Sequence, residues 1–319
     1  MFLHESTLHL KFDILTCKNM IKYIDAKHIL QKNKTLDWFG AEYCVNLYRG
    51  CSHGCIYCDS RSSCYQDFEF DQIKPKRNAI SILESELSHK RKRGVIDTGA
   101  MSDPYNPFEK ELNITKDFLY LVNQYDYGVS ITTKSTLIER DIDVLQSISY
   151  KAPVICELTI TAAKDELSKK LEPHAPPSSE RFRTLETLAN AGLFAGIVLM
   201  PVLPFIEDTI ENITSIIDLA ADAGASFIYP YFGVTLRHNQ REYFYAKLAS
   251  LFPNHGYVNL YKDIYGDTYE CVSKNLQELE YRFTEKCEKH NILYKMDDII
   301  SSYKSRYITQ QLTIFDLLN

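Results

Sequence analysis

Three cysteines within eight residues, Cys51, Cys55 and Cys58, are the feature that most constrains this chain. The other six of its nine cysteines are scattered along the sequence. An odd total with one dense group does not fit a framework of disulfide pairs. In a reducing compartment such a group indicates metal or catalytic chemistry, whereas scattered cysteines are usually small buried hydrophobes. The spacing C-x3-C-x2-C therefore predicts a metal site.

Two kinds of metal site fit this loop. A cubic iron–sulfur cluster has four irons and normally four thiolate ligands, so three cysteines would leave one iron open to an external ligand. Gly50 and Gly54 would allow the unusual backbone angles of a chain wrapped around a cluster. A structural zinc ion is four-coordinate and would need a further ligand from His53, Cys64 or Cys44. The second C-x2-C pair that commonly completes a zinc site is absent from the sequence.

Short apolar or β-branched runs alternate with segments of helical period. With 319 residues and 45% hydrophobic content, one barrel-sized domain with appendages is the simplest expectation. Strands that alternate with helices predict βαβ crossovers and a parallel sheet, either doubly wound or closed into a barrel. The six runs expected to be strands are residues 43–48, 95–98, 128–132, 154–160, 196–201 and 227–231.

Residues 178–192 and 208–224 have the clearest helical period. Ser178 or Ser179 can cap the first helix, and Gly224 marks the end of the second. Both sheet architectures place chemistry in the loops after the carboxyl ends of strands. The cysteine group directly follows the first predicted strand, so we expect it on the active face.

We expect three regions in the chain. Residues 1–40 form an N-terminal extension with a short strand at 8–12 and no assigned chemistry, residues 41–235 form the barrel, and residues 236–319 form a helical C-terminal region with a terminal tail. Neither a signal peptide nor a run of about 20 apolar residues is present. The chain is therefore expected to be cytoplasmic, without a membrane partner. Helices are expected in the last region near 240–252 and 276–290.

The segment from Arg49 to Cys58 resembles the signature of the radical S-adenosylmethionine (SAM) superfamily, including an aromatic residue, Tyr57, before the third cysteine. The resemblance implies a partial (β/α)6 TIM-type barrel and a [4Fe-4S] cluster held by the three cysteines, whose open iron is chelated by SAM. An electron donor such as a flavodoxin or ferredoxin would reduce the cluster, which would cleave SAM to methionine and a 5'-deoxyadenosyl radical. The cofactor carries this chemistry, and the protein orients it and excludes side reactions.

A closer likeness covers residues 43 to 235. It is similar to the spore photoproduct lyase-related branch, which includes DNA repair lyases that reverse a thymine photodimer and also members whose substrates are not established. The stretches that carry this likeness are 46–55, 102–105, 133–135, 170–173 and 200–204.

The resemblance also implies residues that contact SAM. Tyr57 would lie against the adenine. Ser102 and Asp103 follow the second strand, where the superfamily usually has a Gly-Gly-Glu-like turn for the methionine amino group. Either side chain could replace that acceptor, and an Asp-Pro turn in which Asp103 satisfies local backbone is an equal alternative.

Three residues after later strands complete this set. Lys134 lies just past the third strand and could meet the methionine carboxylate as a point charge, or remain a solvated lysine. Thr159 and Thr161 face the same side of the fourth strand and could bond the ribose or carboxylate. Cys156 lies mid-strand, which favours a packed core residue over a hydrogen donor.

The evidence for a nucleic-acid partner is local. The formal net charge of -6 gives no general basic footprint. The densest basic run, residues 89–93, precedes the second strand and so belongs to the end of the barrel opposite the active face. The tail segment from Gln311 to Phe315 resembles the short motif by which bacterial DNA repair and replication proteins bind the sliding clamp. A tail packed on its own barrel is the alternative.

The favoured interpretation is a radical SAM enzyme. Its reaction could be similar to that of the DNA photoproduct lyases. The first alternative is a radical SAM enzyme that modifies RNA, protein or a metabolite, because no basic groove is evident. The second is a zinc-stabilised, clamp-associated binding protein without catalysis.

Overall fold

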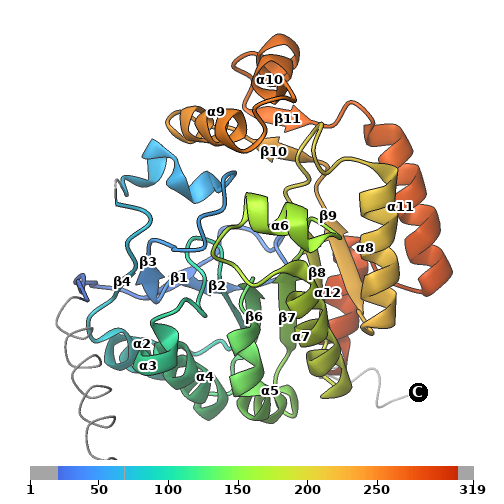
Figure 1. Cartoon of the computed structure of the whole chain (residues 1–319). Coiled ribbons are helices and arrows are strands. Elements are labelled where there is room, and N and C mark those ends of the chain that lie inside the picture. The colour runs from blue at the N-terminus through green and yellow to red at the C-terminus, as the bar shows by residue number, and fades with distance from the viewer. Residues whose placement is uncertain (1–20, 68, 308–319) are drawn as a thin grey trace, which may run out of the picture.

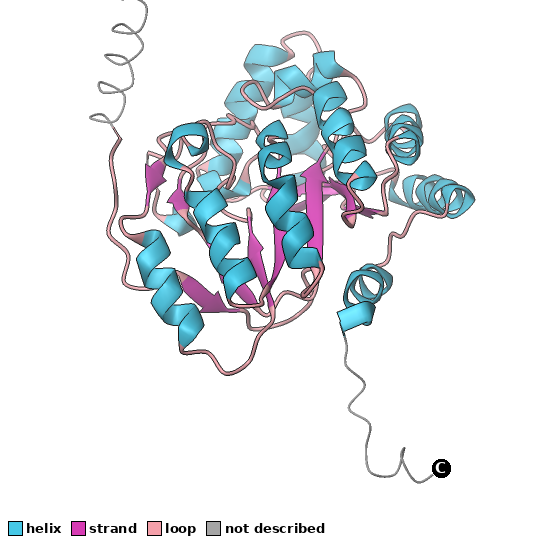
Figure 2. Ribbon diagram, turned by 90° about the horizontal axis from the view of Figure 1, so that it is seen from below, coloured by secondary structure: helices cyan, strands magenta, loops and turns pink. Residues whose placement is uncertain are grey.

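A computed structural model of the chain describes residues 21–67 and 69–307 (Figures 1 and 2). The predicted strand at 8–12 and the predicted clamp motif at 311–315 lie outside these residues. Among the helices described, none is both long and apolar enough to cross a membrane.

The elements follow one another in a largely alternating order. The strands are β1 (Leu30–Lys32), β2 (Tyr43–Val45), β3 (Tyr48–Arg49), β4 (Lys74–Pro75), β5 (Val95–Thr98), β6 (Gly128–Thr133), β7 (Val154–Thr159), β8 (Ala195–Leu199), β9 (Phe227–Pro230), β10 (Gly233–Thr235) and β11 (Glu270–Val272). The α-helices are α2 (Ala79–Ser88), α3 (Glu109–Leu112), α4 (Ile114–Gln124), α5 (Ile142–Ser149), α6 (Asp165–Leu171), α7 (Ser178–Asn190), α8 (Ile210–Asp222), α9 (Gln240–Leu251), α10 (Tyr257–Tyr265), α11 (Leu276–His290) and α12 (Met296–Lys304). The 3-10 helices are η1 (Asp59–Arg61), η2 (Ser63–Tyr65), η3 (Thr136–Asp141) and η4 (Ser305–Tyr307).

The main sheet has the strand order β1-β2-β5-β6-β7-β8-β9. The six strands from β2 to β9 in this order are parallel, and β1 is antiparallel to β2 at one edge. A doubly wound sheet reverses its strand order at a switch point, whereas this order follows the sequence throughout. Helices cover the outside of the curved sheet (Figure 2). The predicted partial (β/α)6 barrel is therefore confirmed.

The strands and helices fall close to their predicted places, with two corrections. The first run forms a strand only as far as Val45, because Tyr48–Arg49 separates as β3 and pairs with β4. The predicted serine cap of α7 is wrong. Ser178 already lies in the helix, and the Asp165 carboxylate accepts the N–H of Ser179 at 2.9 Å.

Two cores close the two ends of the barrel. At the amino ends of the strands, Val95, Ile155 and Phe227 pack in one cluster with aromatic and apolar residues of the 38–41 segment and α12, and Val198 of β8 joins the same cluster. At the opposite end, the C-terminal unit of α9, α10, β10 and β11 lies above the sheet (top of Figure 1). Its core includes residues of the cysteine loop, so this unit is built directly onto the loop.

Helix α8 gives a direct test of the packing. Ile216 is fully buried on its inner stripe, while Leu219 on the same helix is exposed. We expect Ile216→Ala to lower the free energy of unfolding by about 2–5 kcal/mol, because the lost methyl groups leave a cavity. Leu219→Ala should change it by less than about 0.5 kcal/mol. Urea titration monitored by circular dichroism measures both, and equal losses would contradict the assigned inner face.

Candidate active site at the cysteine loop

Contacts with distant segments hold the cysteine loop at the carboxyl end of the sheet. The Cys51 N–H donates to Phe70 O at 2.8 Å, and the Ile56 N–H donates to Leu171 O at 3.0 Å. The hydroxyl of Ser102, which follows β5, donates to Gly50 O at 2.5 Å. The path of the loop is therefore set by three separate parts of the chain.

Position 50 requires glycine because of its backbone φ angle and because of the atoms packed against it. Its φ of +79° is unfavourable for residues with a side chain, and a Cβ there would lie 2.3 Å from Gln72 O. Gly54 also has a positive φ, +70°, and a Cβ there would lie 3.0 Å from Cδ2 of His174. The predicted need for glycine around the cysteines is thus visible in the backbone.

The three predicted ligand thiols share a largely buried environment. Cys55 is buried, and Cys51 and Cys58 are half-buried. Burial raises the pKa of Cys51 to about 11 and the pKa values of Cys55 and Cys58 above the ordinary thiol range. The nearby Lys134 ammonium acts in the opposite direction on Cys55 and Cys58. Metal binding at these thiols would therefore displace protons.

The donor set suits a cluster. In a cubic cluster each thiolate binds a different iron, so the three sulfur atoms need not converge on one point. Within residues 21–67 and 69–307, no three His, Cys, Asp or Glu side chains gather in a group that could hold a single metal ion.

A buried ion pair lies beneath the loop. The Glu172 carboxylate accepts hydrogen bonds from the Tyr57 hydroxyl and from Arg181 Nη2. Lys134 Nζ lies 3.8 Å from Glu172 Oε1 and 5.8 Å from the centroid of the Tyr57 ring. Burial opposes ionisation of Glu172, but Arg181 and Lys134 outweigh it and hold the pKa of Glu172 below its ordinary value. Glu172 is thus a buried anion with cations on two sides.

Both carboxylate oxygens of Asp103 already accept hydrogen bonds from neighbouring residues. Its Oδ1 accepts the Tyr105 N–H at 2.9 Å and the Thr133 hydroxyl at 2.7 Å, while its Oδ2 accepts the Lys134 N–H at 2.9 Å. His53 Nδ1 lies 3.4 Å from the same Oδ2. The bond to the Tyr105 N–H is the local one expected of an Asp-Pro turn, and the bonds to Thr133 and Lys134 join the β5 and β6 loops.

The remaining predicted SAM contacts are brought to the same end of the barrel. Thr159 and Thr161 are buried, and the Thr159 carbonyl accepts a hydrogen bond from Arg181 Nη1 at 2.7 Å. Lys134 is partly buried against Tyr57 and Glu172, so it is not a solvated loop lysine. Cys156 is fully buried in the main core, as its mid-strand position predicted.

Sequence reasoning assigned no role to three residues that hold this site. Glu172 lay within a stretch that carried the family resemblance, so a signal existed. Arg181 gave none, because a helical arginine usually faces solvent. Gln240 is fully buried, and its Nε2 donates to Tyr57 O at 2.9 Å and to Thr235 O at 3.0 Å. Its partner in the loop lies 183 positions away, a distance that no local pattern spans.

Comparison with known proteins gives the family. The model of the radical SAM superfamily matches residues 45–223, more than half of the chain. This chain belongs to the radical SAM superfamily. An uncharacterised protein of Mycobacterium tuberculosis is 30% identical over 230 residues, which cover 70% of this chain and 67% of the relative. An uncharacterised protein of Methanocaldococcus jannaschii is 31% identical over 172 residues, 53% of this chain and 63% of the relative.

A solved structure has a similar fold. Spore photoproduct lyase complexed with dinucleoside spore photoproduct aligns with a TM-score of 0.62 over 83% of this chain and 77% of that chain, at 15% identity. A variant of that enzyme with bound SAM and the same dinucleoside aligns with a TM-score of 0.61, at 16% identity over 83% and 78% of the two chains. This likeness in fold covers more of the chain than the family match does.

The buried ion pair yields a stability test. Glu172→Gln should lower the free energy of unfolding by about 3 kcal/mol, because it leaves the buried Arg181 without its counter-charge. The matched control is Glu166→Gln on the adjoining helix, which removes an exposed ion pair with Lys170 and should leave stability unchanged. Chemical denaturation of both variants measures the difference. Equal stability of the two variants would contradict the importance of the pair.

Glu207 yields a pH test. Burial raises the pKa of Glu207 to about 8, although its Oε2 accepts the Leu203 N–H at 3.0 Å. An unfolded glutamate releases its proton above about pH 4.3, so between that value and pH 8 the unfolded chain binds fewer protons and the protein loses stability as pH rises. Glu207→Gln removes this loss. Its unfolding free energy relative to the unmodified protein should therefore increase across this window, and parallel pH profiles would contradict the shift.

Proposed function

We propose that Cys51, Cys55 and Cys58 bind a [4Fe-4S] cluster whose fourth iron takes SAM. The observation that carries this proposal is the position of the three thiols, on one loop at the carboxyl end of the parallel sheet of a radical SAM barrel. Chemistry in such barrels occurs at this end. When bound, the cluster and SAM supply a one-electron reduction and an adenosyl-centred radical that removes hydrogen from a substrate.

The chain's own residues would orient the cofactor. Lys134 keeps its charge, because the neighbouring Cys55 and Glu172 raise its pKa although burial opposes this. An ammonium has three donors, so Lys134 can bind the methionine carboxylate while it remains near Glu172. Tyr57 is fixed at its hydroxyl by Glu172, which suits a ring held against the adenine.

The other residues predicted to contact SAM differ in how much hydrogen-bonding capacity they have left for a ligand. Ser102 donates its proton to Gly50 O, so its oxygen can still accept a bond from the methionine amino group. Asp103 already accepts three hydrogen bonds and acts chiefly by fixing the loops that carry Thr133 and Lys134. Thr159 and Thr161 are candidates for the ribose or carboxylate.

The proposal also includes the type of reaction, the electron donor and the cellular location. A lyase-like reaction on DNA is supported by the fold shared with spore photoproduct lyase, and a radical modification of RNA, protein or a metabolite is the alternative. A flavodoxin or ferredoxin would supply the electron in the cytoplasm. The regions 1–40, 41–235 and 236–319 and the clamp-binding tail remain predictions.

Cysteine substitutions test the cluster. After anaerobic reconstitution, the unmodified protein should bind four irons with the visible absorbance of an iron–sulfur cluster, and should form 5'-deoxyadenosine from SAM under dithionite. Replacing Cys51, Cys55 or Cys58 with alanine should abolish both, because each removes one ligand. The matched control is Cys64→Ala, an exposed cysteine nearby. It should keep both properties.

The same experiment separates the zinc alternative. A protein that holds one zinc per chain, lacks SAM cleavage and loses its metal on Cys64→Ala would be the zinc-stabilised binding protein. Metal analysis of the purified and reconstituted samples decides between these outcomes.

A further inference from the structure

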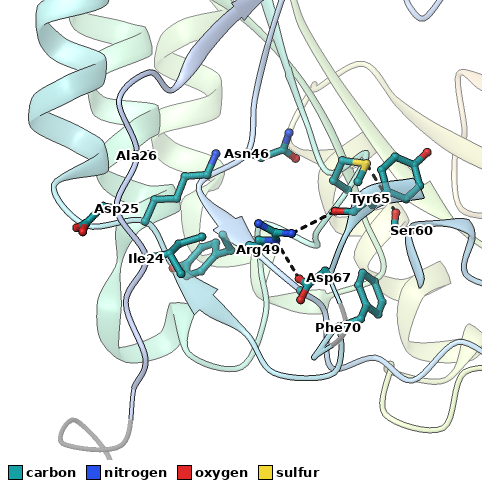
Figure 3. A pocket seen from close by; sticks show the side chains of 13 residues that line it. Ile24, Asp25, Ala26, Asn46, Arg49, Ser60, Tyr65, Asp67 and Phe70 are labelled. Carbon is teal, nitrogen blue, oxygen red and sulfur yellow. Dashed lines mark hydrogen bonds and ion pairs between the residues drawn. The ribbon is translucent and has the colours of Figure 1, made fainter. Parts of the chain in front are cut away.

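A cavity of about 350 Å³ lies beside the cysteine loop (Figure 3). The segment Ile24–Ala26 lines one side of it, and Arg49 and Gly50, which directly precede the first cysteine, line another. Its volume falls within the range of small-molecule sites. It reaches the cysteine loop from outside the set of residues that we assign to SAM.

Most charged groups around this cavity already have partners. Arg49 Nε donates to Asp67 Oδ2 at 3.2 Å, and its Nη2 donates to the carbonyl of Tyr65 (Figure 3). The same Nη2 also donates to the carbonyl of Gln66. Asp67 is also 2.9 Å from Lys74 Nζ. The charges of these groups are balanced by their pairing with one another, so the groups are not free to bind a ligand.

Two polar groups on the wall stand apart from these pairs. Lys76 is half-buried, and within residues 21–67 and 69–307 no carboxylate lies within ion-pair distance of its ammonium. The carboxylate that acts on it electrostatically, Glu86, is bound by the N–H groups of Ile29 and Leu30. Asn46 Oδ1 is buried, with no hydrogen-bond partner among the described residues. Burying such groups without partners is unfavourable.

The cavity also has an apolar side and a connection to the loop. Tyr65 and Phe70 line it with aromatic rings. Ser60, two residues after Cys58, lines the same cavity, and its hydroxyl contacts Met101 Sδ at 3.9 Å. A molecule bound here would therefore lie against both ends of the segment that carries the cysteines.

We propose that this cavity binds the substrate, and that the substrate is a small molecule with a carboxylate or phosphate group held by Lys76, which selects the metabolite alternative of the proposed function over DNA. Asn46 accepts a hydrogen bond from a donor on the same molecule, and the aromatic side chains pack against its apolar part. This inference rests on the proposed function, because the bound molecule is a substrate only if the chain carries out radical SAM chemistry. The binding site itself can be tested independently.

Binding to the reconstituted full chain, measured by calorimetry with SAM present, tests the site. The probes are phenyl phosphate, benzoate and the neutral benzyl alcohol, so that the two sources of negative charge are compared. Both anions should bind more tightly than the alcohol, and the tighter of the two identifies the preferred group. Lys76→Met should weaken anion binding about tenfold or more, the usual scale for a charge-assisted bond, and should leave the alcohol unaffected.

Two further variants keep this test decisive. Lys164→Met removes an exposed lysine that pairs with Glu211, and neither residue lines the cavity. This variant should bind every probe as the unmodified protein does. Asn46→Asp places a carboxylate beside the anion and should weaken binding even if Lys76→Met does not fold.

The outcomes separate this inference from the proposed function. SAM cleavage without anion binding, or anion binding that is insensitive to both Lys76→Met and Asn46→Asp, overturns the inference alone. Lys76-dependent anion binding by a protein that forms no 5'-deoxyadenosine overturns the proposed function and leaves the site intact. Tight binding of a thymidine oligonucleotide, with no binding of the small anions, would replace the small-molecule substrate with a nucleic acid.

Discussion

The buried ion pair between Glu172 and Arg181 is the interaction on which the site depends. Arg181 is fully buried and also donates to the Thr159 carbonyl at the end of β7. Without a counter-charge its burial would be strongly unfavourable. Glu172 supplies that charge and also accepts the Tyr57 hydroxyl, so the same carboxylate joins α7, the barrel wall and the cysteine loop. The orientation of the residue beside the third cysteine thus follows from the need to neutralise a buried arginine.

The C-terminal unit also holds the cysteine loop in place. Its apolar residues form one core with Cys55, Ile56 and Tyr57, and Gln240 bonds the loop backbone at Tyr57 O. The loop therefore has the barrel on one side and a folded cap on the other. Water therefore reaches the loop less readily than it would reach an uncovered surface loop.

Local patterns predicted the fold well and the site in part. The runs at 95–98 and 276–290 became β5 and α11 with their predicted bounds, because periodicity and end signals act over a few residues. The cysteine spacing is also a local pattern. The bonds of Tyr57 to Glu172 and to Gln240 are set by the tertiary fold, which brings together residues more than 100 positions apart. The serine cap on α7 failed for the same reason, since Asp165 reaches that position from another helix.

The charge state of the barrel interior differs from what the acidic composition of the chain suggests. Burial raises the pKa values of Asp97, Glu157 and Glu207 well above the usual carboxyl range. Near neutral pH these groups therefore carry less negative charge than the composition implies. Lys134 meanwhile retains its proton beside the cysteines. A cluster bound by three thiolates would bring its own negative charge, and the Lys134 ammonium would offset part of it. The net charge of -6 thus says little about the field that a carboxylate or phosphate would meet at the cysteine loop, because that field also depends on the cations Lys134 and Arg181 beside Glu172.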